Sequence, residues 1–316
     1  MLASFKKLGI LGINRRVAQY ILPNNDRADY PVVDDKVLTD ERLRKNGLAM
    51  PENYAVIASQ GDLRFIKEQL VDFKDGFVIK PASGSQGNGI VVIDKIIKEE
   101  DRTYFVKASG QRLVTDQIRY HVSSIISGLY SLSGLTDKAI IQEKLRPHPI
   151  FKKYSFGGIP DIRVIVFKGY PVMAMVRLPT KASDGKANLH QAAVGCGIDL
   201  KTGRVCGAVC QDQKIEYHPD TKNKFSDLVI PQWMDILTLS AQVFDYCPLG
   251  YMGVDIILDP DKGPMILEIN ARPGLSIQLA NHQGLIHPLE AIEAQERKGT
   301  NYLARMAEFK QWQGLT

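Results

Sequence analysis

Hydrophobic residues in this chain fall mostly into short segments in which apolar and polar positions alternate, separated by glycine, proline and asparagine. Alternation of this kind predicts β-strands, and two such segments joined by a short glycine-containing turn predict a hairpin. Strands and hairpins are predicted over residues 76–81, 89–96, 104–114, 138–145, 161–179, 253–259 and 265–270.

Other segments place apolar residues every three or four positions, a spacing that predicts helices. They cover residues 34–50, 60–73, 118–132 and 233–246, with further helices at the two ends of the chain, the first within residues 5–16. Because hairpins dominate and the helices are grouped apart from them, the predicted fold class is α+β rather than a parallel doubly wound sheet.

One predicted hairpin carries oxygen-bearing side chains in otherwise apolar strands. Glu268 and Asn270 are two positions apart and therefore share a face of their strand. If residues 253–259 pair with this strand across the turn at 260–263, Asp255 falls opposite Glu268 or the residue before it. Three oxygen donors with little room for a cationic side chain beside them suit Mg²⁺. An exposed hairpin with solvated acids is the alternative interpretation.

A second candidate feature is the loop ASGSQGNGI at residues 82–90, which places three glycines between two predicted strands. Backbone N–H groups of such a loop can approach phosphates closely. Its order, G-x-x-G-x-G, and the strand that follows it match neither a Rossmann fingerprint nor a P-loop. Lys80 closes the preceding strand, and a partly buried lysine favours an anionic partner such as phosphate. The alternative is an ordinary hairpin loop with a snorkelling lysine.

Further polar side chains stand in or near predicted strands. Gln142 and Glu143 follow two isoleucines. Asp161 and Arg163 share one face of a strand, where an ion pair between them is the simpler interpretation. The remaining candidates, each more typical of a surface or structural residue when taken alone, are Arg177, Asn188, His190 and Arg272.

Composition narrows the class of protein. With 316 residues, 44% hydrophobic and 24% charged, the chain is typical of a soluble globular protein of about two domains. The net charge of +5 is scattered among acids, so nucleic acid is not an expected partner. No apolar run approaches the ~18 residues of a membrane span, and the N-terminus lacks the features of a signal peptide. Four cysteines without CxxC or zinc spacing favour reduced thiols and a cytoplasmic location.

The order of these features resembles that of the ATP-grasp superfamily and, within it, of the RimK-like α-L-glutamate ligases. A lysine and glycine loop, a QE strand end, DIRV, ANLHQ and LEINARPG follow one another over about residues 34–281. The resemblance implies an ATP-grasp fold in which two α+β subdomains clasp ATP. The domain limits that it implies are an N-terminal helix and connector at 1–33, a helical start at 34–74, a lid subdomain at 75–145 with the glycine loop and an insertion at 98–138, and a nucleotide- and metal-binding core with the C-terminal helix at 146–316.

The resemblance also implies ligands for metal and for the transferred group. Asp255, Glu268 and Asn270 would bind two Mg²⁺ ions, with Glu268 as the bridge and Mn²⁺ as an alternative metal. Three arginines would stabilise the transferring phosphoryl group or hold the acceptor carboxylate, roles that suit a bidentate guanidinium. They are Arg163, Arg177 and Arg272.

For ATP itself, the resemblance implies that Lys80, with Lys36 as a second cation, contacts the phosphates. The backbone of residues 142–145 would form the hinge that reads adenine, and Asp161 would approach the ribose. The full set of residues implied to contact the nucleotide is Lys36, Lys80, Gly84, Ser85, Gly87, Gly89, Gln142, Glu143, Lys144, Leu145, Asp161, Lys186, Asn188 and His190.

The activity implied by the resemblance is that of an ATP- and Mg²⁺-dependent carboxylate–amine ligase. An acyl phosphate would form, and an amine would displace phosphate to give an amide or peptide bond. The expected substrates are amino acids, peptides or other carboxylates and amines, with glutamate or a related amino acid as the group added. Two alternatives stay open: a kinase that phosphorylates a small molecule from the same nucleotide site, and a nucleotide-binding module without catalytic activity.

The sequence departs from the ATP-grasp pattern at its start. Only about thirty residues precede the segment at 34, where ligases of this superfamily usually carry a full α/β domain that helps to bind the acceptor. The N-terminal region is therefore expected to be reduced, and acceptor recognition is expected to involve the insertion at 98–138.

Overall fold

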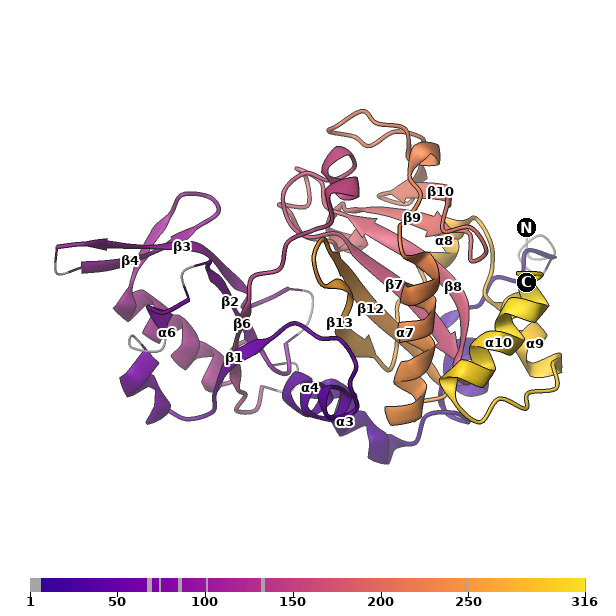
Figure 1. Cartoon of the computed structure of the whole chain (residues 1–316), viewed down its shortest axis with the longest axis horizontal. Coiled ribbons are helices and arrows are strands. Elements are labelled where there is room, and N and C mark those ends of the chain that lie inside the picture. The colour runs from indigo at the N-terminus through magenta and orange to yellow at the C-terminus, as the bar shows by residue number, and fades with distance from the viewer. Residues whose placement is uncertain are drawn as a thin grey trace. The chain divides into compact units, whose positions relative to one another are not determined.

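The chain divides into two compact units in the computed structural model, which describes residues 7–66, 70–73, 75–84, 87–100, 102–131, 134–247 and 249–315. Unit 1 comprises Met1–Val33, Leu38–Met50 and Arg146–Thr316, and unit 2 comprises Asp34–Val37 and Pro51–Leu145. Each unit has an antiparallel sheet with helices set apart from it, so the α+β prediction is confirmed (Figure 1). No helix within the described ranges is long and apolar enough to cross a membrane.

Unit 1 is organised around a seven-stranded sheet in the order β11-β10-β9-β8-β7-β12-β13 among its described residues. Every residue of β7 and β12 is buried, which means that both faces of the sheet are covered at its centre. The strands are β7 (Asp161–Phe167), β8 (Tyr170–Leu178), β9 (Val194–Ile198), β10 (Val205–Cys210), β11 (Gln213–Lys214), β12 (Tyr251–Asp259) and β13 (Gly263–Asn270).

Helix α7 (Trp233–Tyr246) has the predicted limits and contacts β7, β8, β12 and β13, while α10 (Tyr302–Gln313) packs against α7 (Figure 1). Helix α8 (Ile277–Asn281) contacts β8, β9 and β10. The other helical segments that include residues of unit 1 are α2 (Ile13–Arg15), a π-helix (Arg16–Ile21), α3 (Tyr30–Asp34), α4 (Lys36–Lys45), α9 (Ile286–Ala294) and 3₁₀ turns at Arg27–Asp29, Pro149–Lys153, Leu189–Gln191 and Phe225–Asp227.

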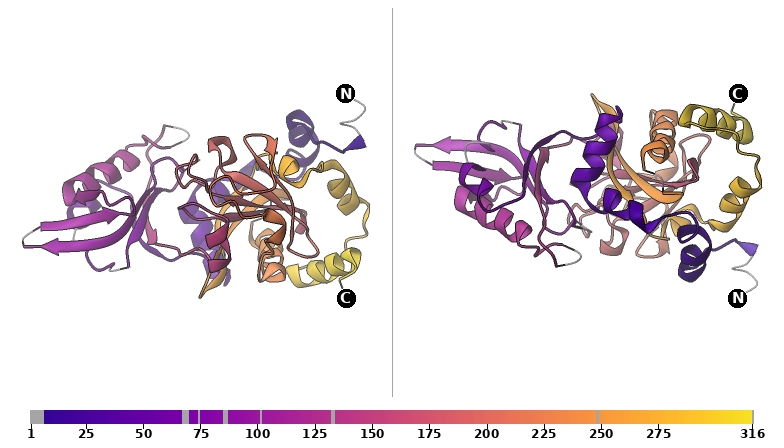
Figure 2. Two further views of the ribbon diagram at one scale, coloured as in Figure 1. Left: turned by 90° about the horizontal axis from the view of Figure 1, so that it is seen from above. Right: turned by 90° about the horizontal axis from the view of Figure 1, so that it is seen from below.

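Unit 2 contains a six-stranded sheet in the order β1-β6-β2-β3-β4-β5, counted over its described residues. Helix α6 (Thr115–Ile126) covers this sheet because its apolar positions, among them Ile118, Val122 and Ile125, join the core that contains Phe77 and Phe105. Figure 2 shows the β3–β4 hairpin projecting from the rest of the unit. The strands are β1 (Asn53–Ile57), β2 (Phe77–Pro81), β3 (Val91–Glu99), β4 (Arg102–Lys107), β5 (Arg112–Val114) and β6 (Ala139–Glu143).

The helix predicted within residues 5–16 is interrupted at residues 8–12. The buried Leu11 donates its backbone N–H to Oε1 of Gln278 at 2.8 Å and accepts from Nε2 of Gln278 at 3.1 Å. Lys7 is helical, residues 8–12 are not, and a further helix begins at Ile13. Positions 1–6 lie outside the described residues. The helix predicted over 118–132 begins and ends earlier, at Thr115 and Ile126. In the segment 60–73 the structure has a 3₁₀ turn at Asp62–Phe65, and positions 67–69 lie outside the described residues.

Candidate functional site

The candidate residues fall into two groups, one in each unit. Unit 1 holds the three arginines, the three metal candidates, Asp161 and the segment from Lys186 to His190. Unit 2 holds Lys36, Lys80, the glycine loop and residues 142–145. Ser85 lies outside the described residues.

The hairpin of β12 and β13 brings the metal candidates together. Asp255 lies opposite Glu268, and Gly253 lies opposite Asn270. The pairs nearer the turn follow a register that, continued unchanged, would have placed Asp255 opposite Leu267; a β-bulge between Asp255 and Ile256 shifts it by one residue. The shift puts Glu268 and Asp255 on the same face of the sheet, and Nδ2 of Asn270 donates to Oδ2 of Asp255 at 3.2 Å.

The expectation that little room remains for a cationic side chain beside Asp255 is wrong. Nε and Nη2 of Arg163 donate to the two carboxylate oxygens of Asp255 at 2.7 and 2.6 Å. Nη2 of Arg177 donates to Asp255 at 2.8 Å, and Nε of Arg177 donates to Asp161 at 2.5 Å. These four side chains form the charge network of unit 1.

Strand register explains this pairing. Arg163 on β7 lies directly opposite Asp255 on β12, and Arg177 on β8 lies directly opposite Asp161 on β7. Side chains opposite one another on neighbouring strands are closer than those two positions apart on one strand. The interpretation of an ion pair between Asp161 and Arg163 is therefore wrong, since each carboxylate pairs across the sheet.

Burial and the two guanidinium groups act in opposite directions on the carboxylates. Burial favours the neutral acid, but Arg163 and Arg177 more than offset it and lower the pKa of Asp255 to about 2. At Asp161 burial prevails over Arg177 and raises the pKa to about 6. Burial disfavours the Arg177 cation, yet Asp161 and Asp255, with a smaller effect from Glu268, raise its pKa above the usual value. Glu268 therefore lies within electrostatic reach of the network.

The donor chemistry of this face suits Mg²⁺. Among the described residues no three His, Cys, Asp or Glu side chains are close enough to hold a metal ion by themselves. Mg²⁺ does not need such a cage, because it takes one or two carboxylates and completes its shell with water and substrate oxygens. Asp255 and Glu268, with the amide oxygen of Asn270, are such a set.

Arg272, which follows β13, makes a different contact. Its guanidinium carbon lies 5.2 Å from the centre of the Tyr30 ring, a cation–π arrangement. The arginine side chain is exposed. The contact holds Arg272 at the polar end of the hairpin, next to Asn270 in the chain.

In unit 2 the candidates are joined by hydrogen bonds across three neighbouring strands. Nζ of Lys80 donates to Oε1 of Gln142 at 2.8 Å, and Nε2 of Gln142 donates to Oδ1 of Asn53 at 2.7 Å. Lys36 reaches the glycine loop, where its Nζ donates to the carbonyl of Gly84 at 2.8 Å. Lys36 and Lys80, the two lysines predicted to contact the phosphates of ATP, are both half-buried.

The remaining candidates of unit 2 are held by their neighbours. Oε1 of Glu143 accepts from the N–H of Glu52 at 2.8 Å, and Nζ of Lys144 pairs with Asp94 at 2.9 Å. Leu145 is buried. In the glycine loop, Gly87 and Gly89 have φ of +76° and +77°. A Cβ atom at Gly89 would also lie 2.7 Å from the ring of Tyr130, so only glycine fits there.

In unit 1 the loop between β8 and β9 lines a pocket of about 550 Å³ that contains the predicted residues Lys186 and His190. Oδ1 of Asn188 accepts from the N–H of His190 at 3.0 Å and caps the 3₁₀ turn at Leu189–Gln191. The pocket also includes Gln191, Asp212 and Ser276, which sequence reasoning missed. They come from three separate segments and have no motif of their own.

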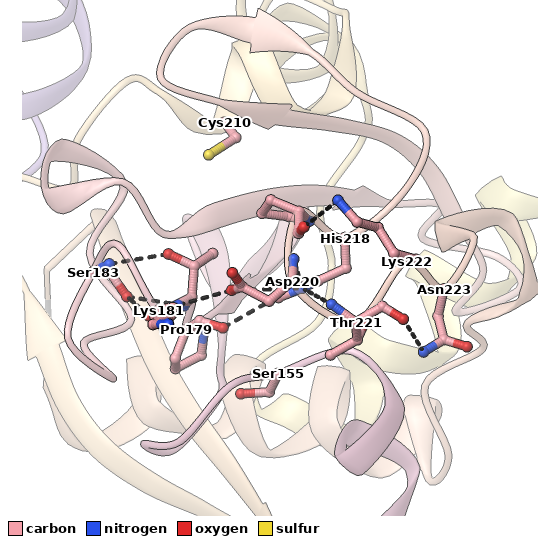
Figure 3. Close-up of polar contacts among 12 residues, drawn as sticks. Ser155, Pro179, Lys181, Ser183, Cys210, His218, Asp220, Thr221, Lys222 and Asn223 are labelled. Atoms are coloured by element: carbon pink, nitrogen blue, oxygen red, sulfur yellow. Dashed lines mark hydrogen bonds and ion pairs between the residues drawn. The ribbon is translucent and has the colours of Figure 1, made fainter.

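The loop rests on His218, a wholly buried side chain that sequence reasoning also missed (Figure 3). Its Nδ1 accepts from the backbone N–H groups of Asp220 and Thr221, both at 3.2 Å. The proton of the neutral ring is therefore assigned to Nε2, which donates to the carbonyl of Pro179 at 3.2 Å. The N–H of Lys181 donates to Oδ2 of Asp220 at 2.8 Å, and this bond holds the same loop at a second point.

A close backbone approach fixes the far side of this loop. A Cβ atom at Gly158 would lie only 1.8 Å from the carbonyl oxygen of Gly185. At the preceding Gly157 the nearest atom would be the Gly185 Cα at 4.0 Å. The segment before β7 and the pocket loop therefore pack main chain against main chain, which requires glycine at position 158.

The comparison with known families bears on both groups of residues. A family model described as sugar-transfer associated ATP-grasp matches residues 15–294. The chain belongs to this ATP-grasp family. The match spans the glycine loop, the charge network and the β12–β13 hairpin, so the ATP-grasp resemblance of the sequence is confirmed.

Individual relatives of this ATP-grasp protein are distant. A protein of Maridesulfovibrio salexigens named "Probable alpha-L-glutamate ligase" is 24% identical over 243 residues, which are 76% of this chain and 56% of that protein. The chain thus spans little more than half the length of this relative. The solved structure of D-cycloserine synthetase DcsG is 13% identical, with a TM-score of 0.48 over 83% of this chain and 70% of that one. The ATP-grasp ligase PsnB complexed with minimal precursor is 15% identical, with a TM-score of 0.42 over 91% and 63%.

Removing Arg177 from the charge network should destabilise this ATP-grasp protein strongly. Arg177→Met takes away the cation that neutralises the buried Asp161 and one of the two that neutralise Asp255. Breaking a buried ion pair by removing one partner costs about 3–5 kcal/mol in free energy of unfolding, measured by urea denaturation. The control is Arg204→Met, which removes an exposed guanidinium bonded to the Ser226 carbonyl and should cost about 0.5 kcal/mol or less. Equal losses in the two variants would contradict the role of the network.

The buried His218 should make stability depend on pH. Burial lowers the pKa of His218 below its ordinary 6.5, so the unfolded chain takes up the proton first as the pH falls. The contribution of the neutral ring is full above pH 6.5 and declines below it, toward the lower pKa of the folded state. His218→Asn should therefore cost about 1–3 kcal/mol at neutral pH and less as the pH is lowered to about 5, measured by urea denaturation at each pH.

The control for His218 is Phe225→Leu. The Phe225 ring lies 6.2 Å from the His218 ring but does not titrate, so its removal should cost the same at every pH. A cost of His218→Asn that stays constant or grows toward acid would show that the ring is not held neutral.

Alanine at Gly158 should displace the pocket loop. Gly158→Ala forces a collision with Gly185 and should cost about 1–3 kcal/mol more than Gly157→Ala, as overpacking does. Both glycines have positive φ, 57° at Gly158 and 61° at Gly157, so the backbone strain of alanine is similar in the two variants. The midpoint of thermal unfolding measures the difference, and equal midpoints would refute the close approach.

Proposed function

We propose that this protein is an ATP- and Mg²⁺-dependent carboxylate–amine ligase that forms an amide or peptide bond through an acyl phosphate. The main support is the charge network of unit 1 beside Glu268 and Asn270, which places guanidinium and carboxylate groups on one sheet without a nucleophilic side chain among them. Phosphoryl transfer needs just such positioning and charge neutralisation rather than a protein nucleophile. The distant relative named as a probable glutamate ligase supports the same choice.

In the proposed reaction, a carboxylate oxygen of one substrate attacks the γ-phosphorus of ATP and ADP leaves. The product is an acyl phosphate. An amine nitrogen of the second substrate then attacks the acyl carbon, inorganic phosphate leaves, and the nitrogen loses a proton as the amide forms. The proposed added group is glutamate or a related amino acid.

The proposed nucleotide residues come from both units. Lys80 and Lys36 would bind phosphate oxygens, a role that suits their half-buried ammonium groups beside the glycine loop. The backbone of 142–145 would bind adenine, and Asp161 the ribose. Within the loop of unit 1, Lys186 and Asn188 would lie near the phosphates. Residues 75–145 would act as the lid that excludes water from the acyl phosphate.

For the metal, Glu268, Asn270 and Asp255 are the proposed ligands. Bound Mg²⁺ would neutralise the phosphate oxygens. Because Oδ2 of Asp255 already accepts from Arg163, Arg177 and Asn270, metal binding at this oxygen requires one guanidinium to turn away. That guanidinium is then directed to a new anion, which suits the proposed contact of these arginines with the transferring phosphoryl group.

Replacement of Glu268 tests the metal proposal. Glu268→Gln keeps the size of the side chain but removes the charge, and we expect turnover of ATP to fall by at least about 100-fold, equivalent to about 3 kcal/mol. The matched control is Asp261→Asn in the turn of the same hairpin, where an exposed carboxylate pairs with Arg146. Near-normal turnover by Glu268→Gln at saturating Mg²⁺ would refute the assignment.

The activity itself is tested by supplying ATP and Mg²⁺ with pooled amino acids, peptides and cell extract, while free phosphate and product masses are followed together. Acceptor-dependent phosphate release with a condensation product is the expected result. A phosphorylated product without free phosphate would establish a kinase instead. ATP binding without turnover in any pool would favour a module that only binds nucleotide.

A further inference from the structure

The stretch of chain that follows helix α6 holds the first residues of the glycine loop in unit 2. The backbone N–H of Ser83 donates to both carboxylate oxygens of Asp137, at 3.1 and 3.0 Å. Gly84 forms an antiparallel β-bridge with Ser131. Asp137 is buried, and the low dielectric around it strengthens its two bonds to Ser83. The loop therefore starts from a fixed position beside the connection between α6 and β6.

The far end of the loop is held by His121, which lies in the middle of α6. Its Nε2 is 2.9 Å from the carbonyl oxygen of Gly89. A carbonyl oxygen only accepts, so the ring donates from Nε2. The His121 side chain is half-buried, and burial lowers its pKa below the ordinary 6.5. At neutral pH the imidazole is therefore neutral, and its one ring proton is assigned to this bond.

A second aromatic ring, that of Tyr130, lies against Gly89 and comes from the same stretch of chain. A Cβ atom at Gly89 would lie 2.7 Å from this ring, and the centres of the Tyr130 and His121 rings are 5.6 Å apart. One ring bonds the carbonyl of Gly89, while the other closes the space beside its α-carbon. Both rings belong to the insertion at 98–138, so this insertion sets the position of Gly89.

Such contacts matter most in a loop with several glycines. Glycine has the widest choice of backbone conformations, so a glycine loop without outside contacts spends only part of its time in any one of them. Helix α6 is a firm support, because Ile118, Val122 and Ile125 have no exposed surface. A ligand that selects one loop conformation binds more tightly when a larger fraction of the molecules already adopts it. The bond from His121 favours one conformation before any ligand arrives.

We propose that His121 is a positioning residue for the nucleotide, because its hydrogen bond holds Gly89 and the end of the glycine loop in the conformation that binds the phosphates. Tyr130 supports the same conformation through its ring. The inference rests on the proposed function, in which the phosphates lie beside this loop. It gives the insertion at 98–138 a role in nucleotide binding in addition to its expected role toward the acceptor.

Calorimetric titration of the full-length protein with Mg·ADP tests this role without any need for turnover. His121→Met removes the donor but keeps an unbranched, helix-forming side chain. We expect its affinity for Mg·ADP to fall about 5-fold, the effect of one lost hydrogen bond, while its affinity for adenosine, which has no phosphates, stays unchanged. Equal affinity of His121→Met and the wild type for Mg·ADP, or an equal loss for adenosine, would overturn the proposal.

A conservative variant and a control on the same helix separate the hydrogen bond from the packing. His121→Gln carries an amide N–H in place of the Nε2 donor and should bind Mg·ADP within about 2-fold of the wild type. Binding by His121→Gln that is no better than that of His121→Met would contradict the role of the hydrogen bond. The control is Tyr120→Met at the adjacent position, where the side chain is 76% exposed, and it should bind Mg·ADP normally.

Amide hydrogen exchange without nucleotide distinguishes a loosened loop from a loosened unit. In His121→Met, exchange at residues 87–90 should be at least about 5-fold faster, while exchange at Ile125 and Ile126 in α6 should not change. Faster exchange at both places would show a general loss of stability and would overturn the positioning role. A wild type that binds Mg·ADP but forms no condensation product would count against the ligase alone, since these readouts concern nucleotide binding.

Discussion

The interior of unit 1 depends on the pairing of two arginines with two aspartates on its most deeply buried strands. The two positive and two negative side chains of this network are only 1–15% exposed. Such burial is costly, and only good geometry offsets the cost. Here each charge lies directly across from its partner on the next strand. A slip of one residue between these strands would place each charged side chain opposite an apolar residue, so the network also specifies strand register.

That constraint explains why the sheet can hold functional groups at its centre. A sheet covered on both faces normally contains only apolar side chains in its inner strands. In such a sheet a buried polar group is tolerated only when another group satisfies its hydrogen bonds. Asn270 and the two arginines donate the hydrogen bonds that satisfy Asp255. Because these groups already hold one another in place, an anion or cation that bound among them would replace one favourable partner by another. The pocket loop differs: His218 and Asp220 hold it by satisfied hydrogen bonds, while Oε1 of Gln191 has no donor among the residues that the structure describes.

The fold was predictable wherever a local pattern decided it. Alternating apolar residues gave the hairpins, and the spacing of Trp233, Ile236 and Leu237 gave α7 its limits. The break in the predicted N-terminal helix was not foreseen because Gln278, more than 260 positions away, bonds the backbone of Leu11. Two oxygen donors on one strand face were enough to predict the polar hairpin. The partners of Arg163 and Arg177 were not predicted correctly, because they lie on neighbouring strands and their identity depends on the register between β7, β8 and β12. Gln191, Asp212 and His218 carried no local signal, since they act only through loops that meet in the folded chain.

The extra residue in β13, Leu267, separates two lengths of the hairpin that differ in character. On the side of the turn, apolar residues pair in one register, and beyond the bulge Asp255, Glu268 and Asn270 pair in another. A residue without a cross-strand partner reverses the side of the sheet that the following side chains of its strand face, so Glu268 shares the face of Asp255 only because Leu267 stands between the two registers. A single unpaired leucine thus decides on which side of the sheet the oxygen donors of β13 lie.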